Sequence, residues 1–333
     1  MTNRQVIVTE LPKSELAQTH FALTEAPMPT PAEGEVLLKT ILTSIDAANR
    51  AWMQGATYRD AVKAGDAMHT YAICQVVESR DKRLQPGDIV AAESTWSDYV
   101  TRPARQCQKL PEGGPLSNLL SVYGIAGKTA FHGLIGVGRA MAGETVVVSA
   151  AAGSVGGYVG QIAKALGCRV VGIAGGAEKC AWVVDELGFD ACVDYRDPGL
   201  FKALKTACPA GIDLYFDNVG GQVLETALFL MNDRGRVVCC GAVSQYDSTN
   251  PAGPRNLPGL VVVKRLRMEG FIVMDFAQED AKALRALKHW VKSGQIKVTE
   301  NIVEGLENAP SALIGLLAGQ NRGKQMVRVA PDP

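Results

Sequence analysis

The sequence predicts an α/β fold in which a doubly wound parallel sheet is joined to a β-rich part. Two observations predict it. Strand and helix patterns alternate through residues 123–297, which is typical of a parallel sheet with helices on both faces. Short alternating or β-branched runs, separated by proline and glycine turns, fill residues 1–122, which is typical of a barrel or sandwich.

The stretch from Thr145 to Lys179 organises the parallel sheet. A β-branched run ending at Val148 gives way to the small residues of a turn, and a helical apolar pattern then runs to Leu166. Strand, glycine-rich turn and helix in this order form the Rossmann unit, which holds a dinucleotide pyrophosphate on the helix N-terminus. The expected pyrophosphate residues are Gly153, Ser154, Val155 and Gly156, with Ala151 in place of the first glycine of the usual motif. An ordinary packing turn between a strand and a helix is the alternative.

The end of the second strand of this unit predicts the cofactor. The strand Arg169 to Ala174 is followed by Gly175-Gly176-Ala177-Glu178-Lys179, without a carboxylate directly at the strand end. An NAD site needs a carboxylate there to bind the ribose 2′-hydroxyl, whereas glycines followed by Lys179 leave room and charge for a 2′-phosphate. Glu178 is expected in the first turn of the next helix, where acids favour the helix dipole. NADPH/NADP is therefore the expected cofactor.

Four further strands and three helices complete the prediction for this half. The strands are Ala191–Tyr195, Ile212–Phe216, Arg236–Cys240 and Met268–Met274, and the helices are Ala177–Leu187, Gln222–Met231 and Glu279–Lys292. Ligands of such sheets bind beyond the carboxyl ends of the strands. Tyr195, Asp217-Asn218 and the turn Gly241 to Tyr246 follow three of those ends. Two short apolar strands are expected around Leu306–Ala318.

The first 122 residues predict five strands and one long irregular segment. The strands are Gln5–Thr9, Glu35–Ser44, Thr70–Glu78, Asp88–Ala92 and Tyr99–Arg102. The segment Ile45–Met68 interrupts them with Trp52, Tyr58 and several polar side chains. A long insertion of this kind is either a binding loop or a cover over the barrel.

Composition and charge point away from nucleic acid and membranes, which leaves the small-molecule partner that the dinucleotide motif predicts. The 333 residues are 47% hydrophobic and 20% charged, and 34 basic residues balance 34 acidic ones, so neither nucleic acid nor an anionic membrane is an expected partner. No signal peptide or membrane-spanning run is visible. The eight cysteines include no C-x-x-C pair, so reduced thiols in a cytoplasmic protein are expected.

Six stretches resemble one family. They are AAAGSVGGYVGQIAK (150–164), VVGIAGGAEKC (170–180), YFDNVGG (215–221), CCGAVSQY (239–246), RMEGFIVMD (267–275) and QNRGK (320–324). They are similar to the zinc-free branch of the medium-chain dehydrogenase/reductase superfamily. The group in question contains NADPH-dependent prostaglandin and leukotriene reductases, 2-alkenal double-bond reductases and curcumin reductases. The resemblance covers nearly the whole chain.

The resemblance implies a domain order and a set of cofactor residues. Residues 1–122 together with 298–333 would form a GroES-like catalytic domain, and 123–297 an inserted Rossmann NADP-binding domain. Relatives are commonly homodimers, and nothing else in the sequence decides the oligomeric state. Lys179 and Tyr195 would hold the 2′-phosphate. The ribose and nicotinamide would be lined by Asn218, by Cys240, Gly241, Ala242, Ser244 and Tyr246 of one turn, by Phe271, Ile272 and Val273 of a strand, and by Asn321. Tyr195, Asn218 and Asn321 could instead be ordinary strand-end or turn residues.

The metal site of the zinc-dependent branch is not expected here. That branch needs a cysteine and a His-Glu pair in the N-terminal domain, plus a four-cysteine lobe. This chain has Ser44-Ile45-Asp46 in the cysteine region, Thr70 after His69, and only two cysteines before the nucleotide-binding domain. No metal is therefore expected.

The resemblance to a zinc-free group favours reduction of an activated C=C bond. NADPH would deliver hydride to the β-carbon of an enal or enone, and a hydrogen-bond donor would stabilise the enolate oxygen. Tyr246 is the candidate catalytic donor; packing on the nicotinamide riboside is its alternative role. A quinone reductase and a non-catalytic, crystallin-like NADPH-binding protein remain the alternative functions.

The substrate residues are less defined, because this chain departs from its relatives. Asp46-Ala47-Ala48-Asn49-Arg50 replaces a run that carries a tyrosine in the family, and Gly127-Lys128-Thr129-Ala130-Phe131 replaces one that ends in tyrosine. The candidates are Asn49, Arg50, Trp52, Tyr58, Lys128 and Phe131. Each has a structural alternative: Lys128 could be solvated, and Trp52, Tyr58 and Trp96 could belong to the core.

Overall fold

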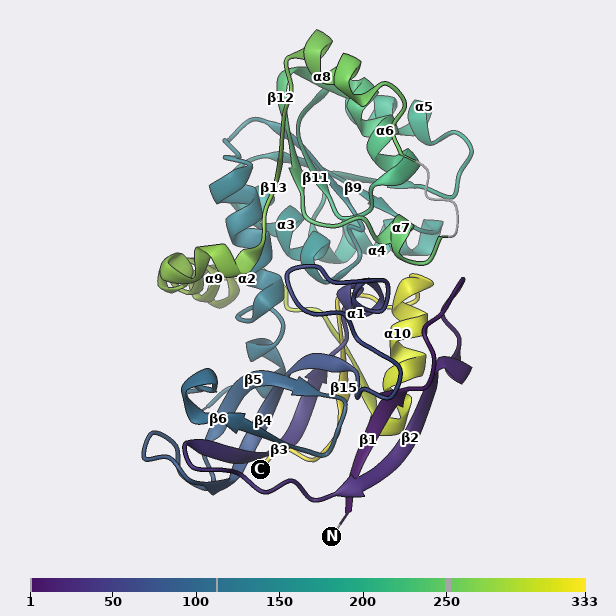
Figure 1. Ribbon diagram of the computed structural model, residues 1–333. Helices are drawn as coiled ribbons and strands as arrows, with labels where there is room; N and C mark the ends of the chain where they lie inside the picture. The colour runs from purple at the N-terminus through teal and green to yellow at the C-terminus, as the bar shows by residue number, and fades with distance from the viewer. Residues whose placement is uncertain (1, 112, 249–252) are drawn as a thin grey trace. The chain divides into compact units, whose positions relative to one another are not determined.

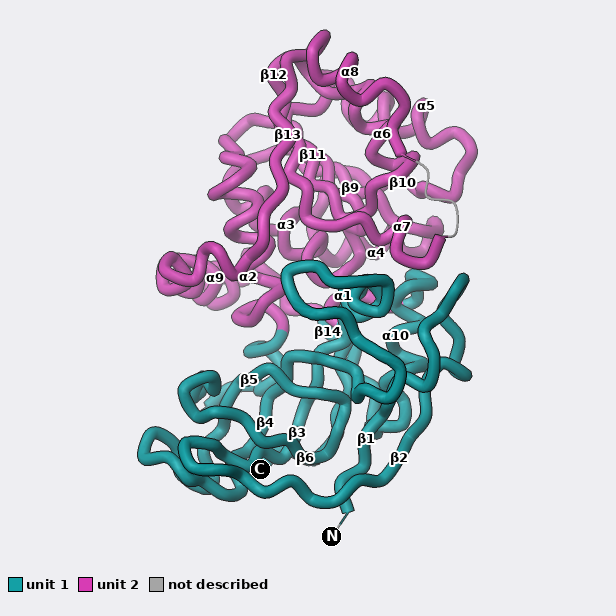
Figure 2. Tube along the Cα trace, viewed as in Figure 1, with its two compact units in different colours: residues 1–120, 300–320, 325–333 teal, residues 121–299, 321–324 magenta. Residues whose placement is uncertain are grey.

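The computed structural model of the chain describes residues 2–111, 113–248 and 253–333 (Figure 1). Two compact units divide it (Figure 2). Unit 1 comprises residues 1–120, 300–320 and 325–333, and unit 2 comprises residues 121–299 and 321–324. The four residues 321–324 of the C-terminal tail therefore pack with unit 2, although the tail on both sides of them packs with unit 1.

Unit 2 is built on a six-stranded parallel sheet with the strand order β10-β9-β8-β11-β12-β13. This is the doubly wound order, with the reversal between β8 and β11, and it confirms the predicted fold class. The strands are β8 (Thr145–Ser149), β9 (Arg169–Ala174), β10 (Ala191–Asp194), β11 (Ile212–Asp217), β12 (Met231–Cys239) and β13 (Arg267–Gly270).

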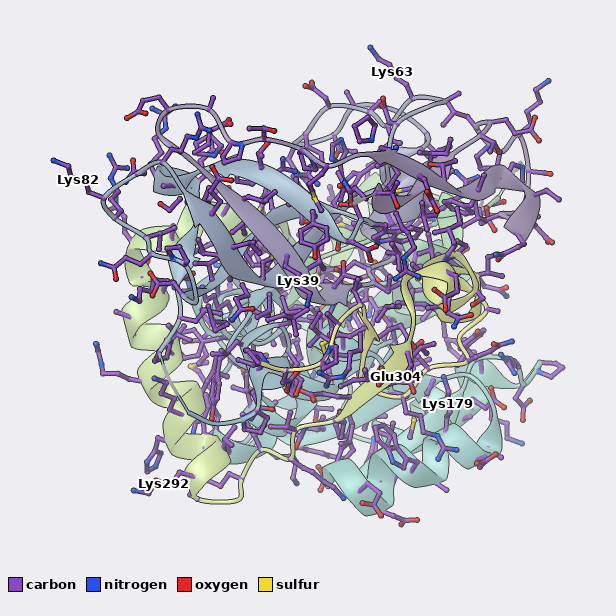
Figure 3. The ribbon with its side chains drawn as sticks, turned by 90° about the horizontal axis from the view of Figure 1, so that it is seen from below. Lys39, Lys63, Lys82, Lys179, Lys292 and Glu304 are labelled. Atoms are coloured by element: carbon purple, nitrogen blue, oxygen red, sulfur yellow. The ribbon has the colours of Figure 1, made fainter. Side chains whose placement is uncertain are left out.

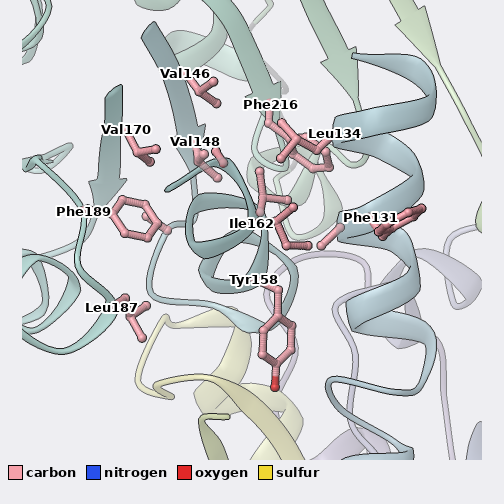
Figure 4. Packing of buried hydrophobic residues seen from close by; sticks show 14 of the residues in the cluster. Phe131, Leu134, Val146, Val148, Tyr158, Ile162, Val170, Leu187, Phe189 and Phe216 are labelled. Carbon is pink, nitrogen blue, oxygen red and sulfur yellow. The ribbon is translucent and has the colours of Figure 1, made fainter. Parts of the chain in front are cut away.

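Side chains alternate between the two faces of this sheet and build two separate cores, as the strand period of two requires. One face packs on α2 (Ile125–Phe131), α3 (Ser154–Ala165), α4 (Ala177–Leu187) and α9 (Asp280–Lys292). The other packs on α5 (Leu200–Ala207), α6 (Gly221–Leu230) and α8 (Leu257–Lys264). Figure 4 shows the first core, where Phe189 lies beside α3. Gly160 of α3 leaves space for that ring, because a Cβ there would overlap it.

Unit 1 holds a seven-stranded sheet whose order is β14-β15-β3-β4-β5-β7, with β6 paired to β3. Its strands are β3 (Glu35–Ser44), β4 (His69–Ser79), β5 (Ile89–Thr95), β6 (Tyr99–Pro103), β7 (Gln108–Lys109), β14 (Glu300–Glu304) and β15 (Lys324–Arg328). A hairpin of β1 (Thr2–Val8) and β2 (Phe21–Pro27) shares a core with α1 (Ala48–Trp52) and α10 (Ala309–Leu317). The predicted β-rich part is confirmed, but the prediction missed β2, β7, β14 and β15.

Three predicted strands are wrong, in two places. The strand expected over Met268–Met274 ends at Gly270, and a 3₁₀ helix, η5 (Val273–Glu279), follows; Phe271, Ile272 and Val273 are therefore not strand residues. The two strands expected around Leu306–Ala318 are instead a 3₁₀ turn and the helix α10. Pro310 in its first turn and Gly319 with φ +67° just past its end are the start and stop signals of a helix.

All eight cysteines are free thiols in the structure. Among the helices of the described ranges, none is long and apolar enough to cross a bilayer.

Candidate active site

The glycine-rich turn after β8 has the geometry of an anion site. Gly153 caps α3 with an extended backbone, and Gly156 lies so close to the turn that a Cβ would overlap the Ala150 carbonyl oxygen. The Ser154 hydroxyl oxygen is buried, and it has no hydrogen-bond partner within residues 2–111, 113–248 and 253–333. A buried donor without a partner is costly. A pyrophosphate oxygen would satisfy it, so the turn fits the expected dinucleotide.

Ala151 takes the place of the first motif glycine without opening the turn. Its side chain is fully buried, and it faces Gly172 on the neighbouring strand β9. A Cβ on Gly172 would lie 2.8 Å from the Ala151 methyl carbon, so only glycine fits there. The extra methyl group that Ala151 brings to the turn is therefore accommodated by the missing side chain of Gly172 on the adjacent strand.

The tail segment 321–324 lies against the same turn. The Gly323 amide donates to the Ala152 carbonyl oxygen at 2.9 Å, and Gly323 bridges to Gly153. Asn321 is buried, and its side-chain amide donates to the Gly323 carbonyl oxygen at 2.9 Å. The structure therefore brings Asn321 to the pyrophosphate turn within unit 2.

The end of β9 is covered by the residues that follow β10. A Cβ on Gly175 would lie 2.9 Å from a ring carbon of Tyr195 and 3.1 Å from Nε of Arg196, so glycine is required for these side chains to fold over the strand end. The Asp194 carboxylate holds the loop, accepting from the amides of Gly176 at 2.8 Å and Arg196 at 2.9 Å. These bonds hold the pKa of Asp194 below its usual value, the Gly176 amide contributing most.

Lys179 lies in the first turn of α4, at the same strand end (Figure 3). Its ammonium donates to the Asn321 carbonyl oxygen at 2.5 Å, which links α4 to the tail segment. Burial lowers the pKa of Lys179, and the charges of Arg322 and Arg196 lower it further. Glu178, in the same turn as predicted, pairs with Arg322. Sequence reasoning missed both arginines: Arg196 lies outside the six family-like stretches, Arg322 lies in QNRGK, from which only Asn321 was selected, and only folding brings the two side chains to Lys179.

An open pocket of about 650 Å³ lies beyond the carboxyl ends of β11, β12 and β13. Six of the predicted cofactor residues line it: Cys240, Gly241, Ala242, Tyr246, Phe271 and Ile272. Leu224, Met268 and Asp275 also line it and were not predicted. Ser244 is exposed and turns away to donate to the Val219 carbonyl oxygen. Burial raises the pKa of the Cys240 thiol to about 12, so this pocket residue is a neutral apolar surface rather than a nucleophile.

Asp217 organises the backbone at the rim of this pocket. It is 2% exposed, and one carboxylate oxygen accepts hydrogen bonds from the Tyr215 and Ser149 hydroxyls and from two backbone amides. Burial nevertheless raises its pKa. Ser149 also accepts from the Asn218 amide at 2.9 Å, and the Asn218 side chain donates to the Ser149 carbonyl oxygen at 2.8 Å. Asn218 is therefore fixed in place by Ser149 and Asp217.

Tyr246 closes the short helix α7 (Val243–Tyr246) at the pocket wall. Its hydroxyl oxygen accepts from the Ala242 amide at 3.2 Å and lies 3.5 Å from the position that a Cβ on Gly241 would take. Because the oxygen accepts from the backbone, the hydroxyl proton is directed away from that amide. The Ala242 amide therefore fixes the position of the Tyr246 hydroxyl oxygen at the pocket wall.

The substrate candidates of unit 1 are engaged in its own packing. Asn49 is 1% exposed and bonds to the Asp46 amide and the His69 carbonyl oxygen; Arg50 is 3% exposed and donates to the Ser14 carbonyl oxygen at 3.0 Å. Trp52 is buried with Arg59 over its ring at 4.5 Å, while Tyr58 is exposed with its ring 6.3 Å from that of Trp52. Only Tyr58 of these four presents most of its side chain at the surface of the unit.

The two candidates on α2 are likewise placed inside unit 2. The Lys128 ammonium lies 2.6 Å from Asp280 of α9, and His132 lies 3.5 Å from the other oxygen of the same carboxylate. Burial lowers the pKa of His132, so this residue is neutral near pH 7. Phe131 belongs to the core, against the rings of His132 and Trp290. Within the described ranges no group of three or more His, Cys, Asp or Glu side chains could hold a metal ion.

Known proteins resemble this chain over its full length. Residues 4–110 match the family described as the N-terminal domain of oxidoreductase, and residues 154–289 match the zinc-binding dehydrogenase family. The NADPH-dependent curcumin reductase of Escherichia coli K12 is 42% identical, over 99% of this chain and 98% of that protein. The NADP(+)-dependent 2-alkenal reductase of Nicotiana tabacum is 38% identical, over 100% and 99%. CurA of Vibrio vulnificus, solved in complex with NADPH, is 38% identical with a TM-score of 0.94, over 99% of this chain and 100% of that chain.

Proposed function

The chain belongs to the zinc-free branch of the medium-chain dehydrogenase/reductase superfamily, and on that premise we propose that it reduces the C=C bond of α,β-unsaturated aldehydes or ketones with NADPH. The observation that carries the proposal is the continuous edge of the parallel sheet. Along it follow a cation-rich strand end at β9, a pyrophosphate turn with an unsatisfied hydroxyl at β8, and an open pocket beyond β11 to β13. A phosphorylated dinucleotide needs these three features in this order.

Gly153 to Gly156 would hold the pyrophosphate, and Lys179 and Tyr195 the 2′-phosphate. Asn218, the turn Cys240 to Tyr246, the residues Phe271 to Val273 and Asn321 would surround the ribose and nicotinamide. Bound NADPH supplies the hydride for the β-carbon of the substrate. We further propose that residues 1–122 with 298–333 form the GroES-like catalytic domain and 123–297 the NADP-binding domain, to which the compactness of unit 2 adds residues 321–324.

The protein's contribution to the chemical step is a hydrogen bond to the oxygen on which negative charge develops. Tyr246 has two features that suit this role: it borders the pocket, and the Ala242 amide fixes the position of its hydroxyl oxygen. A donor fixed before the reaction stabilises the enolate without reorganisation at the moment of transfer. The apolar pocket wall formed by Leu224, Met268 and Phe271 keeps that hydrogen bond strong by limiting water.

Product analysis tests this function. NADPH is mixed with enals, enones and quinones in turn, and cofactor oxidation is followed together with the mass of each product. The proposal expects saturated aldehydes or ketones, heavier than the substrate by two hydrogens and with the carbonyl retained. Quinols as the sole products would assign a quinone reductase instead, and tight NADPH binding without turnover would assign a non-catalytic role.

The Tyr246→Phe variant tests the donor. We expect kcat for an enone to fall about 10²- to 10³-fold, the usual cost of one lost oxyanion donor, with the Kd for NADPH unchanged. Tyr99→Phe, on strand β6 of unit 1, is the matched control and should keep full activity. A Tyr246→Phe enzyme with the kcat of the parent would remove Tyr246 from the catalytic step.

A further inference from the structure

The end of β9 gathers more positive charge than the fold needs. Lys179 and Arg196 follow neighbouring strands, and Arg322 comes from the tail; the charges of both arginines act on the Lys179 ammonium and lower its pKa after burial has done so. Like charges held together oppose folding, so their convergence needs a compensating anion.

Two carboxylates lie in the corner formed by Gly175, Gly176, Lys179, Arg196 and Arg322, and neither forms an ion pair with Arg196. Asp194 is committed to the Gly176 and Arg196 amides, and Glu178 pairs with Arg322. Among the residues that the structure describes, no carboxylate lies within ion-pair distance of the Arg196 guanidinium, which lies 5.8 Å from the Tyr195 ring centre.

The backbone and side chains of this corner also form a recess suited to a phosphate group. Gly175 and Gly176 form its base, with Gly176 at φ +92°, and the Tyr195 ring and Arg196 side chain lie over them. Gly176 is also the N-cap residue of α4, an eleven-residue helix whose N-terminus favours negative charge. Arg322 comes from the tail segment 321–324, and its guanidinium carbon lies 5.9 Å from the ring centre of Trp182 of α4.

The Glu178–Arg322 pair lies at the solvent side of this corner. The Glu178 side chain is 87% exposed and that of Arg322 is 39% exposed. An exposed ion pair contributes little to stability, so exchanging it for a contact to a phosphate dianion costs little. Planar guanidinium groups also match two phosphate oxygens at once, which an ammonium does not.

We propose that Arg196 and Arg322 are specificity-determining residues that, together with Lys179, enclose the 2′-phosphate of NADPH, and that Arg322 leaves Glu178 to do so. This inference rests on the proposed cofactor. It adds two residues from separate elements to the contacts expected of Lys179 and Tyr195. It also assigns Glu178 the role of a competing anion that holds Arg322 in place while the phosphate is absent.

Binding measurements test the inference without reference to turnover. The Kd values of NADPH, NADH, 2′-AMP and 5′-AMP are measured by calorimetry for the parent, Arg196→Gln, Arg322→Gln and Glu178→Gln proteins. Each arginine variant should bind NADPH and 2′-AMP about 10- to 100-fold more weakly, the range of one charge-assisted contact, with NADH and 5′-AMP unchanged. Glu178→Gln should bind NADPH more tightly, and Arg322→Lys should recover only part of the loss. Arg285→Gln, an exposed arginine of α9, is the matched control.

Three outcomes would overturn the inference. Equal weakening of NADPH and NADH would assign the arginines to the fold or the adenosine pocket. Unchanged NADPH affinity in both arginine variants would leave the phosphate to Lys179 and Tyr195. NADH bound as tightly as NADPH by the parent would remove the phosphate site altogether. The mass of the product formed from an enone is independent of all three, so failure here is distinguishable from failure of the proposed function.

Discussion

The end of β9 and the helix α1 both contain basic and amide side chains, but they use them in opposite ways. In α1, Arg50 and Asn49 are almost fully buried and bond to backbone groups of unit 1. At β9, Lys179 is half-buried and lies within the field of two arginines, which lowers its pKa. Buried polar groups that bond only to the backbone stabilise a fold, whereas three cations that converge at one strand end favour an anionic ligand.

This difference separates two predictions that looked alike in sequence. The run Asp46 to Arg50 departs from the pattern of the relatives, whereas the run Gly175 to Lys179 departs from the carboxylate-bearing strand end of an NAD site. The structure gives the first run a packing role, because Asn49 bonds to the His69 carbonyl oxygen and to the Asp46 amide. The second run forms a corner with excess charge. Variants in the two regions should therefore affect different measurements.

The largest effect is expected from Gly175→Asp. A Cβ there would press on the Tyr195 ring, and the new carboxylate would repel a 2′-phosphate. We expect NADPH affinity to fall about 100-fold or more, while NADH is weakened much less, since its 2′-hydroxyl can donate to the carboxylate. Gly175→Ala is the control that carries the steric change alone. Equal losses for both cofactors in the aspartate variant would contradict the assignment of this corner.

In α1, the Arg50→Met substitution should lower the free energy of unfolding and leave the KM for the enone unchanged. Removing the guanidinium deletes a hydrogen bond from a charged, 3% exposed donor to the Ser14 carbonyl oxygen, which should lower the free energy of unfolding by about 1.5–3 kcal/mol. Urea denaturation measures this, with the exposed Arg105→Met as control. If the variant kept the parental stability but had a raised KM for the enone, Arg50 would be assigned to the substrate site instead.

The pH dependence of cofactor affinity sharpens the charge assignment. The lowered pKa of Lys179 means that this ammonium loses its proton at a lower pH than an ordinary lysine. The charge is fully present below that pKa and is lost as pH rises through it, so NADPH affinity should fall at alkaline pH by about 10-fold while NADH affinity stays level. In Lys179→Arg, which keeps its charge, the decline should disappear. If the Lys179→Arg variant lost NADPH affinity at alkaline pH to the same extent, the decline would come from a titratable group other than Lys179.

The smallest effect is expected from Lys128→Met. Lys128 forms a partly buried ion pair with Asp280, so its loss should cost roughly 1 kcal/mol or less, read from the urea midpoint against Lys288→Met, an exposed lysine of α9. KM values for acidic and neutral enones should both stay at the parental level. A rise confined to acidic enones would show that Lys128 meets the substrate carboxylate.

Local patterns were enough to predict most of the parallel sheet. The strand Arg169–Ala174 and the helix Ala177–Leu187 have the predicted bounds, because β-branched runs and bounding glycines mark them clearly. The strand predicted through Phe271 to Met274 fails because an apolar run alone does not tell where pairing with β12 ends. The helix α10 was mistaken for strands, since a short apolar run fits either period.

The candidate site shows the same limit. Gly153, Gly175 and Lys179 belong to a continuous motif and were predicted from it. Arg196 and Arg322 reach the same corner from a strand end and from the C-terminal tail, 126 positions apart in the chain by their numbers. Ser149 and Asp217 fix Asn218 from within the sheet, and no pattern marks a buried polar residue as a positioning group rather than a core residue.

The proposed reaction is tested most directly by following an isotope. NADPH carrying deuterium at the transferred position of its nicotinamide is oxidised with an α,β-unsaturated ketone, and the product is analysed by NMR. The account predicts a saturated ketone with one deuterium on the β-carbon and a hydrogen from solvent on the α-carbon. Deuterium on the carbonyl carbon of an alcohol product, or no deuterium in the product, would contradict it.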